Sequence, residues 1–568
     1  MNTREIFLNQ KIPDINREEQ RAIGDFGMTA SATKQSSEIG AQVLKNGGNA
    51  VDAIVAMQFA LAVSEPFNTG LGASGFLLVY NQYSGKTKVI NGHSKAPDQL
   101  TSDMCRNEKG EPIPFSERTI NANFIGIPGI LKAMETAFNT YGTMPLDRLI
   151  EPSVQLAEEG MEVNWLWDMA LKMYGDRVGT TAKSFFFPDN VPLVKGEIVK
   201  NKELAHTLRI IQEKGIDAFY HGEIGDAIIQ LINNENGCMS KEDLQGYESK
   251  IQEPILGSYK DFHIVTPSPP NGAGVSLLQL LKILEKVKIE QYPVNSWEKH
   301  YLLAEAMRIV FTDKLTYMGD PDFTHIPVEG LLHPEYIAER VKLINFEGLN
   351  QGVDFGNPWK YDKKGVQSED SLHRELQGGE TTHFTAVDSW GNIAVCTSSL
   401  EHYFGSGIMV PGYGFLLNND LTDFYPTEES VNDLQANKYP VSSKCPTIIF
   451  KDEKPFMTLG SPGGPTIVAS VAQVILHVID YKMDLKEAIE QPRIYNSTAP
   501  TILCDGSLNE EVKSKLSSIG FEIIGTDIAI GNVQAVLMDQ EKNIMYGAAD
   551  SSRPGVAIGI FKENNEGY

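Results

Sequence analysis

Residues 378–397 read GGETTHFTAVDSWGNIAVCT, and this stretch decides the fold expected for the chain. Thr382–Val387 and Ile393–Thr397 are rich in β-branched and aromatic residues, which favours strands. The turn-forming residues Ser389-Trp390-Gly391 lie between them. The pattern therefore predicts an antiparallel hairpin, with glycine at the left-handed position of the turn.

The register of this hairpin predicts that two hydroxyl side chains lie side by side. If Asp388 faces Asn392, counting outward one residue at a time on both strands places Thr381 opposite Ser399. Thr381 directly follows the flexible sequence Gly378-Gly379-Glu380. A threonine hydroxyl becomes a good nucleophile when a base takes its proton, and the residue's own α-amine is one such base. That amine titrates at about 7.7–8.0 and exists only if the chain is cut before the threonine.

A Thr-Thr pair is weak evidence by itself, because Thr180-Thr181 is another one and an ordinary core strand would explain the stretch. Residues 380–385, ETTHFT, nevertheless resemble the gamma-glutamyltranspeptidase family of N-terminal nucleophile hydrolases, whose precursors cut themselves before the first threonine of a TTH(Y/F)(S/T) motif. Further blocks resemble this family in the same order, from about Ala30 to near the C-terminus. These blocks are Asn46–Ala53, Tyr141–Leu146, Gly319–Asp322, Phe404–Gly407, Gly414–Phe424, Val441–Thr447 and Gly460–Gly464.

The resemblance implies a fold, a cleavage site and a division of the chain. The fold is α/β (α+β), the four-layer αββα sandwich of the N-terminal nucleophile hydrolases, with an additional helical region. The cut falls between Glu380 and Thr381. Residues 1–380 then form the large-subunit region of the proenzyme, and residues 381–568 form the small-subunit region that begins with the nucleophile. Ser399 stands where well-known members have a threonine, and is expected to hydrogen-bond the amine or hydroxyl of Thr381.

A glycine pair is the candidate for binding negative charge during the reaction. Phe456–Leu459 predicts a strand and Pro465–Asp480 predicts a helix with one apolar face, so Gly463 and Gly464 lie in the turn before a helix N-terminus. Backbone amides there stabilise negative charge, and the local pattern suits a bound phosphate equally well. The resemblance implies that Gly463 and Gly464 form an oxyanion hole.

The substrate-binding residues follow the family pattern only in part. Asp423 matches the acidic residue that holds the substrate α-amine, and Ser442 and Ser443 match the pair that helps to bind the α-carboxylate. His93 stands where the family has an arginine for that carboxylate, and histidine is mostly neutral at pH 7. Lys95 is the nearby alternative, although a lysine lacks the planar fork of arginine.

Two further positions make the expected pocket more acidic than the family pattern. Glu401 stands where asparagine is usual, and Asp420 where glutamine or glutamate is usual. Three acids, counting Asp423, favour an ammonium group and oppose a carboxylate that no cation holds. We therefore expect poor acceptance of glutathione and a preference for a related acyl group.

The function implied by the resemblance is that of a self-processing gamma-glutamyltranspeptidase or glutathione hydrolase-like enzyme. Such an enzyme cleaves γ-glutamyl amide bonds through an acyl-threonine intermediate and passes the acyl group to water or an amine. The alternative is a cephalosporin-acylase-like or other small-amide hydrolase on the same scaffold. A catalytically idle binding protein is a third hypothesis, against which the intact TTHF, Ser399 and Gly463-Gly464 argue. The expected partners are a small-molecule γ-glutamyl or related amide and the two fragments of the same precursor.

Composition excludes several other classes of function. A chain of 568 residues that is 41% hydrophobic can bury a large core, and its net charge of −25 argues against nucleic acid and anionic membranes as partners. The five cysteines are scattered without ligand spacing, so we expect no metal site and no disulfide framework. Gly70–Gly75, GLGASG, follows a predicted helix and precedes a predicted strand, the reverse of a dinucleotide fingerprint, so we expect no cofactor.

Three segments bear on location and mobility. Residues 1–27 are polar and lack the apolar stretch of a signal peptide, so a cytoplasmic location is the expectation. Residues 53–63 are strongly apolar but too short to span a bilayer, and are predicted to form a buried helix. Residues 353–379 are polar and have little periodicity, which predicts a flexible tether.

Overall fold

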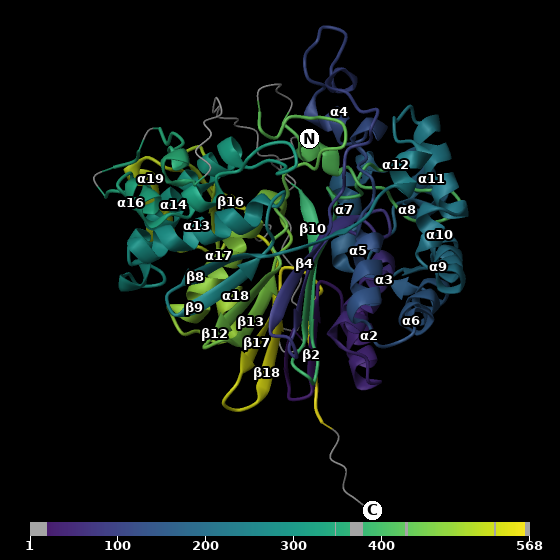
Figure 1. Cartoon of the computed structure of the whole chain (residues 1–568), viewed down its shortest axis with the longest axis horizontal. Helices are drawn as coiled ribbons and strands as arrows, with labels where there is room; N and C mark the ends of the chain where they lie inside the picture. Colours follow the sequence, from purple (N-terminus) through teal and green to yellow (C-terminus); the bar gives the residue numbers. More distant parts are fainter. Residues whose placement is uncertain are drawn as a thin grey trace, which may run out of the picture.

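Two seven-stranded sheets lie face to face between two layers of helices (Figure 1). The computed structural model describes residues 20–346, 348–350, 352–363, 379–425, 430–526 and 530–562. The first sheet has the strand order β1 (Arg21–Gly24), β18 (Ile544–Ala549), β17 (Gln534–Asp539), β13 (Lys454–Gly460), β12 (Thr447–Lys451), β9 (Phe262–Thr266) and β8 (Ile255–Tyr259). The second sheet has the order β19 (Val556–Ile560), β2 (Gly27–Ser31), β10 (Glu380–Val387), β11 (Ile393–Glu401), β3 (Ser74–Asn81), β4 (Lys86–Gly92) and β7 (Lys250–Gln252).

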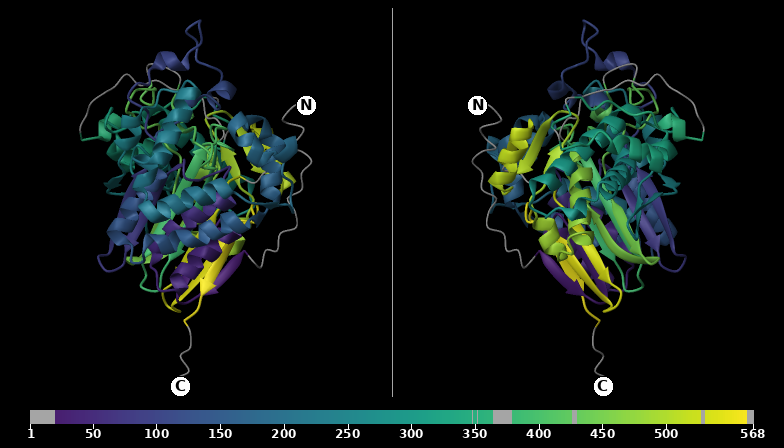
Figure 2. Two further views of the ribbon diagram at one scale, coloured as in Figure 1. Left: turned by 90° about the vertical axis from the view of Figure 1, so that its right-hand side faces the viewer. Right: turned by 90° about the vertical axis from the view of Figure 1, so that its left-hand side faces the viewer.

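Each sheet is covered on its outer face by helices, which lie in front of the strands in both side views of Figure 2. The helices on the side of the second sheet are α2 (Lys34–Lys45), α3 (Ala50–Ser64), α5 (Ile130–Tyr141), α6 (Leu146–Glu159), α7 (Trp165–Tyr174), α8 (Thr180–Phe186), α9 (Lys202–Lys214), α10 (Asp217–Tyr220), α11 (Glu223–Asn234) and α12 (Lys241–Gln245). Those on the side of the first sheet are α13 (Gly272–Lys286), α14 (Trp297–Tyr317), α16 (Pro334–Val341), α17 (Ile467–Ile479), α18 (Leu485–Glu490) and α19 (Glu510–Ile519). The predicted αββα sandwich with an additional helical region is therefore confirmed.

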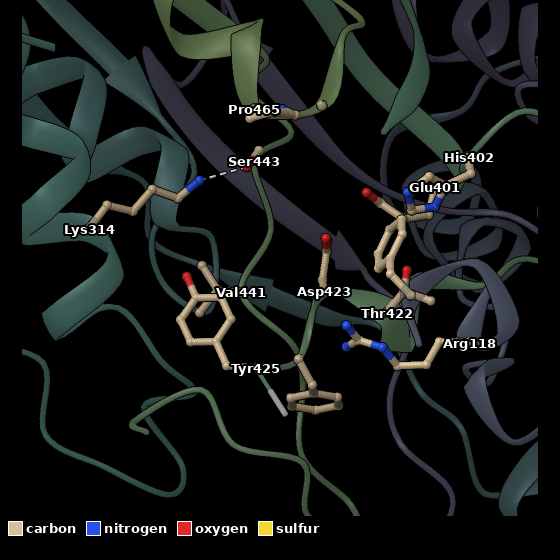
Figure 3. A pocket seen from close by; sticks show the side chains of 13 residues that line it. Arg118, Lys314, Glu401, His402, Thr422, Asp423, Tyr425, Val441, Ser443 and Pro465 are labelled. Carbon is tan, nitrogen blue, oxygen red and sulfur yellow. Dashed lines mark hydrogen bonds between the residues drawn. The ribbon is translucent and has the colours of Figure 1, made fainter. Parts of the chain in front are cut away.

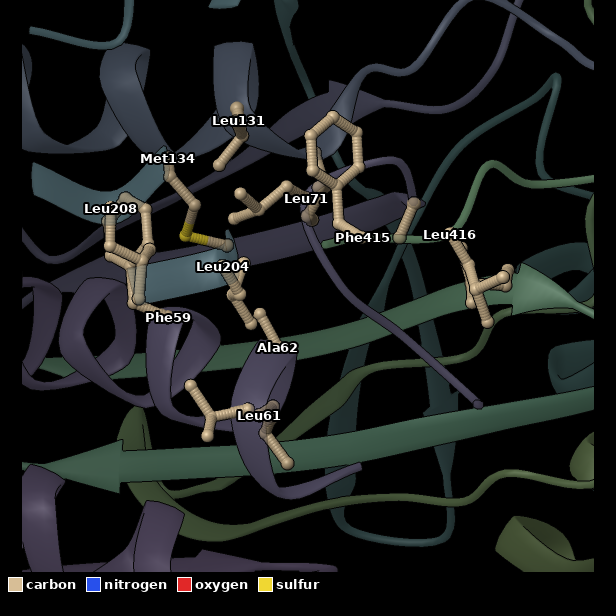
Figure 4. Close-up of a cluster of buried hydrophobic side chains, with 14 of the residues drawn as sticks. Phe59, Leu61, Ala62, Leu71, Leu131, Met134, Leu204, Leu208, Phe415 and Leu416 are labelled. Carbon is tan, nitrogen blue, oxygen red and sulfur yellow. The ribbon is translucent and has the colours of Figure 1, made fainter. Parts of the chain in front are cut away.

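Three hydrophobic layers hold the four layers of the sandwich together, because the central strands are buried on both faces. In β3, Phe76 and Leu78 pack between the two sheets, whereas Leu77 and Val79 pack against the helices of the second sheet. Figure 4 shows part of that outer core, where Phe59 of α3 and Met134 of α5 meet. Successive residues of a strand point to opposite faces, so burial on both sides requires an unbroken apolar run.

The predicted hairpin forms, with the predicted register over most of its length. Partners run from Val387 with Ile393 to Thr382 with Ser398 between β10 and β11. The turn glycine, Gly391, has a φ of 86°, the left-handed conformation expected of it.

Two other local predictions are confirmed, and the predicted start of one helix is corrected. Residues 50–63 lie in α3, all of whose residues are buried. The GLGASG segment lies between α3 and β3, so its helix and strand come in the order that a dinucleotide site does not have. At the other predicted turn, a single 3₁₀ turn at Gly464–Thr466 precedes α17, so the α-helix begins at Ile467 and not at Pro465.

Both sheets contain strands from before and after residue 380. In the second sheet, β10 lies between β2 and β11, and in the first sheet β12 pairs with β9. The two predicted fragments would therefore share one fold. Of the predicted tether, residues 364–378 lie outside the described residues, as do residues 1–19 of the N-terminal segment. None of the helices in the described ranges is long and apolar enough to cross a membrane.

Candidate active site

Thr381 lies in an irregularity at the open end of the hairpin. The regular pairing stops at Thr382 with Ser398, and the next pair is Glu380 with Glu401, so Ser399 and Leu400 of β11 form a β-bulge opposite Thr381. Thr381 is only 2% exposed. A bulge turns the strand locally and re-aims side chains, which is why bulges are common beside active sites. The predicted register holds as far as Thr382 and Ser398 and shifts by one residue beyond them, so Thr381 faces Ser399 together with Leu400.

The hydroxyl of Ser399 contacts the peptide bond that is predicted to be cut. Its Oγ donates to the carbonyl oxygen of Glu380 at 2.5 Å and accepts from the backbone N–H of Glu401 at 2.7 Å. The sequence had led us to expect a contact with the amine or hydroxyl of Thr381. A donor on the Glu380 oxygen stabilises the negative charge that develops there when a nucleophile attacks the carbonyl carbon.

A buried arginine near the C-terminus holds the same segment from the other side, and no sequence pattern had pointed to it. Arg553 Nη1 donates to the carbonyl oxygen of Thr381 at 3.0 Å and pairs with Glu65 Oε1 at 3.3 Å. Arg553 Nη2 pairs with the carboxylate of Glu380. Glu65 in turn accepts from Thr382 Oγ1 at 2.6 Å. Burial raises the pKa of Glu65, and the Arg553 guanidinium opposes this effect.

The glycine pair approaches the chain immediately before Glu380. The carbonyl oxygen of Gly463 accepts from the N–H of Thr466 at 3.1 Å and from its Oγ1 at 2.9 Å, which fixes the turn. Gly464 has a φ of 54°, and a Cβ there would lie 2.5 Å from the backbone nitrogen of Gly379. Both its conformation and this close approach require glycine at position 464.

The histidine of the TTHF sequence is a packing residue. His383 Nδ1 lies 2.9 Å from Thr397 Oγ1, and a Cβ at Gly460 of the first sheet would lie 2.2 Å from the ring. Complete burial lowers the pKa of His383 to about 3. The ring is therefore neutral at physiological pH and lies between the two sheets.

His93 belongs to the same row of the second sheet as Ser399, beneath the surface. Ser74 pairs with Ser399 between β3 and β11, and its Oγ lies 3.3 Å from His93 Nδ1. The other ring nitrogen, Nε2, lies 3.1 Å from the carbonyl oxygen of Pro440. Burial, and after it Lys444, lowers the pKa of His93 to about 3. Both ring nitrogens thus face groups of the protein, and neither His93 nor Lys95 is among the residues that line the adjacent cavity.

A cavity that is open to solvent begins beside Gly464 and Glu401. We call it the charged cavity. In Figure 3, Lys314 of α14 and Glu401 of β11 extend towards it from opposite sides, with Asp423 between them. The lining residues are Phe115, Arg118, Lys314, Glu401, His402, Thr422, Asp423, Phe424, Tyr425, Val441, Ser443, Gly464 and Pro465.

Lys444 neutralises much of the acidic cluster at the base of the charged cavity. Its Nζ lies 3.4 Å from Glu401 Oε2 and 3.2 Å from Asp420 Oδ1. Asp420 is completely buried and also accepts from Ser94 Oγ at 2.5 Å. The three acids predicted from the sequence, Glu401, Asp420 and Asp423, do gather here, but a buried lysine lies among them.

The pKa values of the acidic cluster and of Lys444 are shifted in different directions. Burial, and then the charge of Asp423, raises the pKa of Glu401 well above its usual range, which favours the protonated form of this side chain. Burial raises the pKa of Asp423 to about 6, although Lys444 opposes it. Burial alone would lower the pKa of Lys444, but Asp420 and the other acids outweigh it and raise that pKa. Burial alone would raise the pKa of Asp420, but Lys444 and the other favourable contacts together outweigh it, and the pKa is lowered.

The two predicted serines have different surroundings. Ser443 lines the charged cavity, and its Oγ accepts from Lys314 Nζ at 2.6 Å. Ser442 is completely buried, and its Oγ accepts from the N–H of Lys444 at 3.1 Å. Burial lowers the pKa of Lys314 to about 8, an effect that Asp423 opposes. Within the described ranges, no group of three or more His, Cys, Asp or Glu side chains is placed to hold a metal ion.

The fold is the four-layer sandwich of the N-terminal nucleophile hydrolases. The family model described as Gamma-glutamyltranspeptidase matches residues 36–560, and the chain belongs to this family of enzymes. It is 44% identical over 540 residues to the glutathione hydrolase proenzyme of Bacillus subtilis (strain 168), covering 95% of this chain and 92% of that protein. It is 32% identical over 539 residues to the glutathione hydrolase proenzyme of Escherichia coli (strain K12), covering 92% and 90%.

A solved structure resembles almost the whole chain. The crystal structure of cephalosporin acylase from Bacillus halodurans superposes with a TM-score of 0.86 at 25% sequence identity, covering 98% of this chain and 99% of that one. Relatives of this chain therefore carry the names of both enzymes that the sequence analysis weighed against each other.

Proposed function

We propose that this chain cuts itself between Glu380 and Thr381 and then hydrolyses or transfers the acyl group of γ-glutamyl or related amides. The observation that carries the proposal is the 2.5 Å hydrogen bond from Ser399 Oγ to the Glu380 carbonyl oxygen, next to a buried threonine. The two products, residues 1–380 and 381–568, would be partners within one sandwich, because both sheets contain strands of each.

In maturation, the hydroxyl of Thr381 attacks the carbonyl carbon of Glu380. The C–N bond breaks as the C–O bond forms, so an ester replaces the peptide bond and the amine of Thr381 takes up a proton. Water then hydrolyses the ester, which frees the hydroxyl and leaves Glu380 with a carboxylate. Ser399 stabilises the charge on the carbonyl oxygen during these steps, and Arg553 positions the segment through the Thr381 carbonyl at 3.0 Å.

In turnover, the same hydroxyl attacks the amide carbonyl of a substrate, with the freed α-amine of Thr381 as the base. The substrate amine leaves with the proton, and an acyl-threonine remains. Water or a second amine attacks this ester and regenerates the hydroxyl. The amides of Gly463 and Gly464 are our candidates for holding the oxyanion, because the turn contacts the chain one residue before Glu380 and precedes α17.

The acyl group is proposed to occupy the charged cavity, between Gly464 and the Lys314–Ser443 pair. Glutathione hydrolase relatives support a γ-glutamyl acyl group. One observation favours the second candidate, an amide hydrolase of the cephalosporin acylase kind: His93 is buried with both ring nitrogens facing protein groups, so it offers no clamp for an α-carboxylate.

The proposal is tested on the purified protein by a denaturing gel, N-terminal sequencing and release of an aromatic amine from a γ-glutamyl anilide. We expect two bands and a new N-terminus at Thr381. A single band that persists on prolonged incubation, or a new N-terminus at another residue, would contradict the assignment of the nucleophile.

A further inference from the structure

The ammonium group of Lys444 already occupies the centre of the acidic cluster. It lies 3.4 Å from Glu401 and 3.2 Å from Asp420, and its residue is only 2% exposed. A buried ion pair of this kind is held in place by the charges around it, since a buried cation without a partner is very costly. The position that an ammonium group of a substrate would seek among these acids is therefore filled by a side chain of the protein.

The charges that remain around the charged cavity do not attract a second ammonium. Lys444 lies within ion-pair distance of both Glu401 and Asp420, so Asp423 is the one of the three acids that it does not pair with. Lys314 faces Asp423 from α14 and adds a positive charge of its own. An ammonium brought into this desolvated site meets Lys444 and Lys314, and like charges placed together in such a site are repelled strongly.

The same cavity offers a cation to a carboxylate. Lys314 lines it and donates to Ser443 Oγ at 2.6 Å, a contact that uses one of the three donors of an ammonium group. A lysine and a serine hydroxyl beside it are suitable donors for a carboxylate.

We propose that Lys444 is a specificity-determining residue that takes the place of a substrate ammonium, so that the cavity prefers an acyl group with a carboxylate and no ammonium, such as glutaryl, over γ-glutamyl. This inference rests on the proposed function. It names the acyl group for which the same site is suited.

The test compares two anilides with the same aromatic amine, γ-glutamyl and glutaryl, which differ only in the α-ammonium. The quantity measured is the ratio of kcat/KM for the γ-glutamyl anilide to that for the glutaryl anilide. We expect a ratio below one for the native enzyme. Lys444→Met should raise the ratio by at least about tenfold, because it removes a buried positive charge from the ammonium position.

Two further variants keep the test interpretable. Lys444→Met leaves Asp420 buried without its cation, so the double variant Lys444→Met with Asp420→Asn removes both charges and should raise the ratio in the same direction. Lys486→Met is the matched control, because Lys486 is also a buried lysine, paired with Glu490 at 2.7 Å, away from the charged cavity. It should leave the ratio unchanged.

Three results would contradict the role of Lys444 in substrate preference. A native enzyme that prefers the γ-glutamyl anilide, or a ratio that neither Lys444 variant raises, overturns the inference. A matured enzyme that cleaves neither anilide overturns it as well. A chain that never matures contradicts the proposed function itself, which the denaturing gel reveals separately.

Discussion

The region around the nucleophile and the charged cavity lie side by side but are built in different ways. Thr381 and Ser399 belong to neighbouring strands of one hairpin, and the Ser399 hydroxyl meets a backbone carbonyl. The charged cavity is assembled from side chains of a long helix, a strand end and several loops, including Lys314 of α14 and Glu401 of β11. The first arrangement depends on strand register, and the second depends on which charges the fold happens to bring together.

The two regions should therefore respond differently to substitutions of their side chains. The position of Thr381 depends on strand pairing and on two side chains, those of Ser399 and Arg553, that donate to backbone carbonyls of this segment. The substrate preference of the charged cavity should change when one of its charged residues is substituted, because the pKa of each group depends on the charges of the others. Lys444 and Asp420 illustrate this, since each shifts the pKa of the other.

The largest expected effect is at the nucleophile itself. Thr381→Ala should remain a single chain of 568 residues and show no anilide cleavage, because it lacks the attacking hydroxyl. Thr385→Ala is the control in the same strand; its hydroxyl lies 2.8 Å from Thr458 Oγ1 between the sheets, so this variant should mature. A denaturing gel distinguishes them, and cutting of Thr381→Ala at the same bond would refute the mechanism.

The next effect tests whether one hydroxyl serves both halves of the reaction. Ser399→Ala should slow maturation by about 10²–10³, the usual cost of a missing oxyanion donor. It should also slow turnover, because Ser399 is expected to hydrogen-bond the amine or hydroxyl of Thr381. Ser398→Ala is the matched control, because its hydroxyl lies 2.7 Å from Thr69 Oγ1, away from the Glu380 carbonyl. The rates are followed by gel densitometry and anilide release. Normal rates in Ser399→Ala would remove Ser399 from the site.

A third variant tests the boundary between the two regions. His93→Arg would restore the family's residue, but the site is completely buried between Ser74 and Pro440. We expect it to lower the free energy of unfolding by about 1–3 kcal/mol through overpacking, and to leave the anilide ratio unchanged. His263→Arg, on an exposed position of β9, should change stability by less than about 0.5 kcal/mol. Denaturant unfolding measures both, and a ratio shifted towards γ-glutamyl in His93→Arg alone would place its side chain in the cavity after all.

The smallest effect is a pH dependence of the charged cavity. The pKa of Asp423 is about 6, so raising the pH through this value adds a negative charge and should favour an ammonium-bearing substrate. The ratio of γ-glutamyl to glutaryl kcat/KM should rise about threefold between pH 5 and pH 7, the effect of a weak ion pair. Titration of the Thr381 amine affects both substrates alike and cancels in the ratio. Asp423→Asn should flatten the profile, and a ratio that falls with pH would show that another group dominates.

The family and the sandwich could be predicted from the sequence, because the ETTHFT motif and the blocks around it resemble the gamma-glutamyltranspeptidase family. The hairpin could be predicted from local signals: strand periodicity from Thr382 to Val387 and a turn at Gly391. Such signals act between residues close in the chain, where register and turn geometry follow from residue type. The bulge of Ser399 and Leu400 opposite Thr381 could not be predicted in this way, because it depends on how the strand end meets Glu401.

The charge of the cavity and the surroundings of the predicted cleavage site could be known only from the tertiary structure, because they depend on contacts between residues far apart in the sequence. Arg553 pairs with Glu65 from 488 residues away, and Lys444 pairs with Asp420 across a loop, yet neither pair has a motif. Whether a carboxylate binds a substrate or a lysine depends on burial and on the nearest opposite charge, and both are properties of the folded chain.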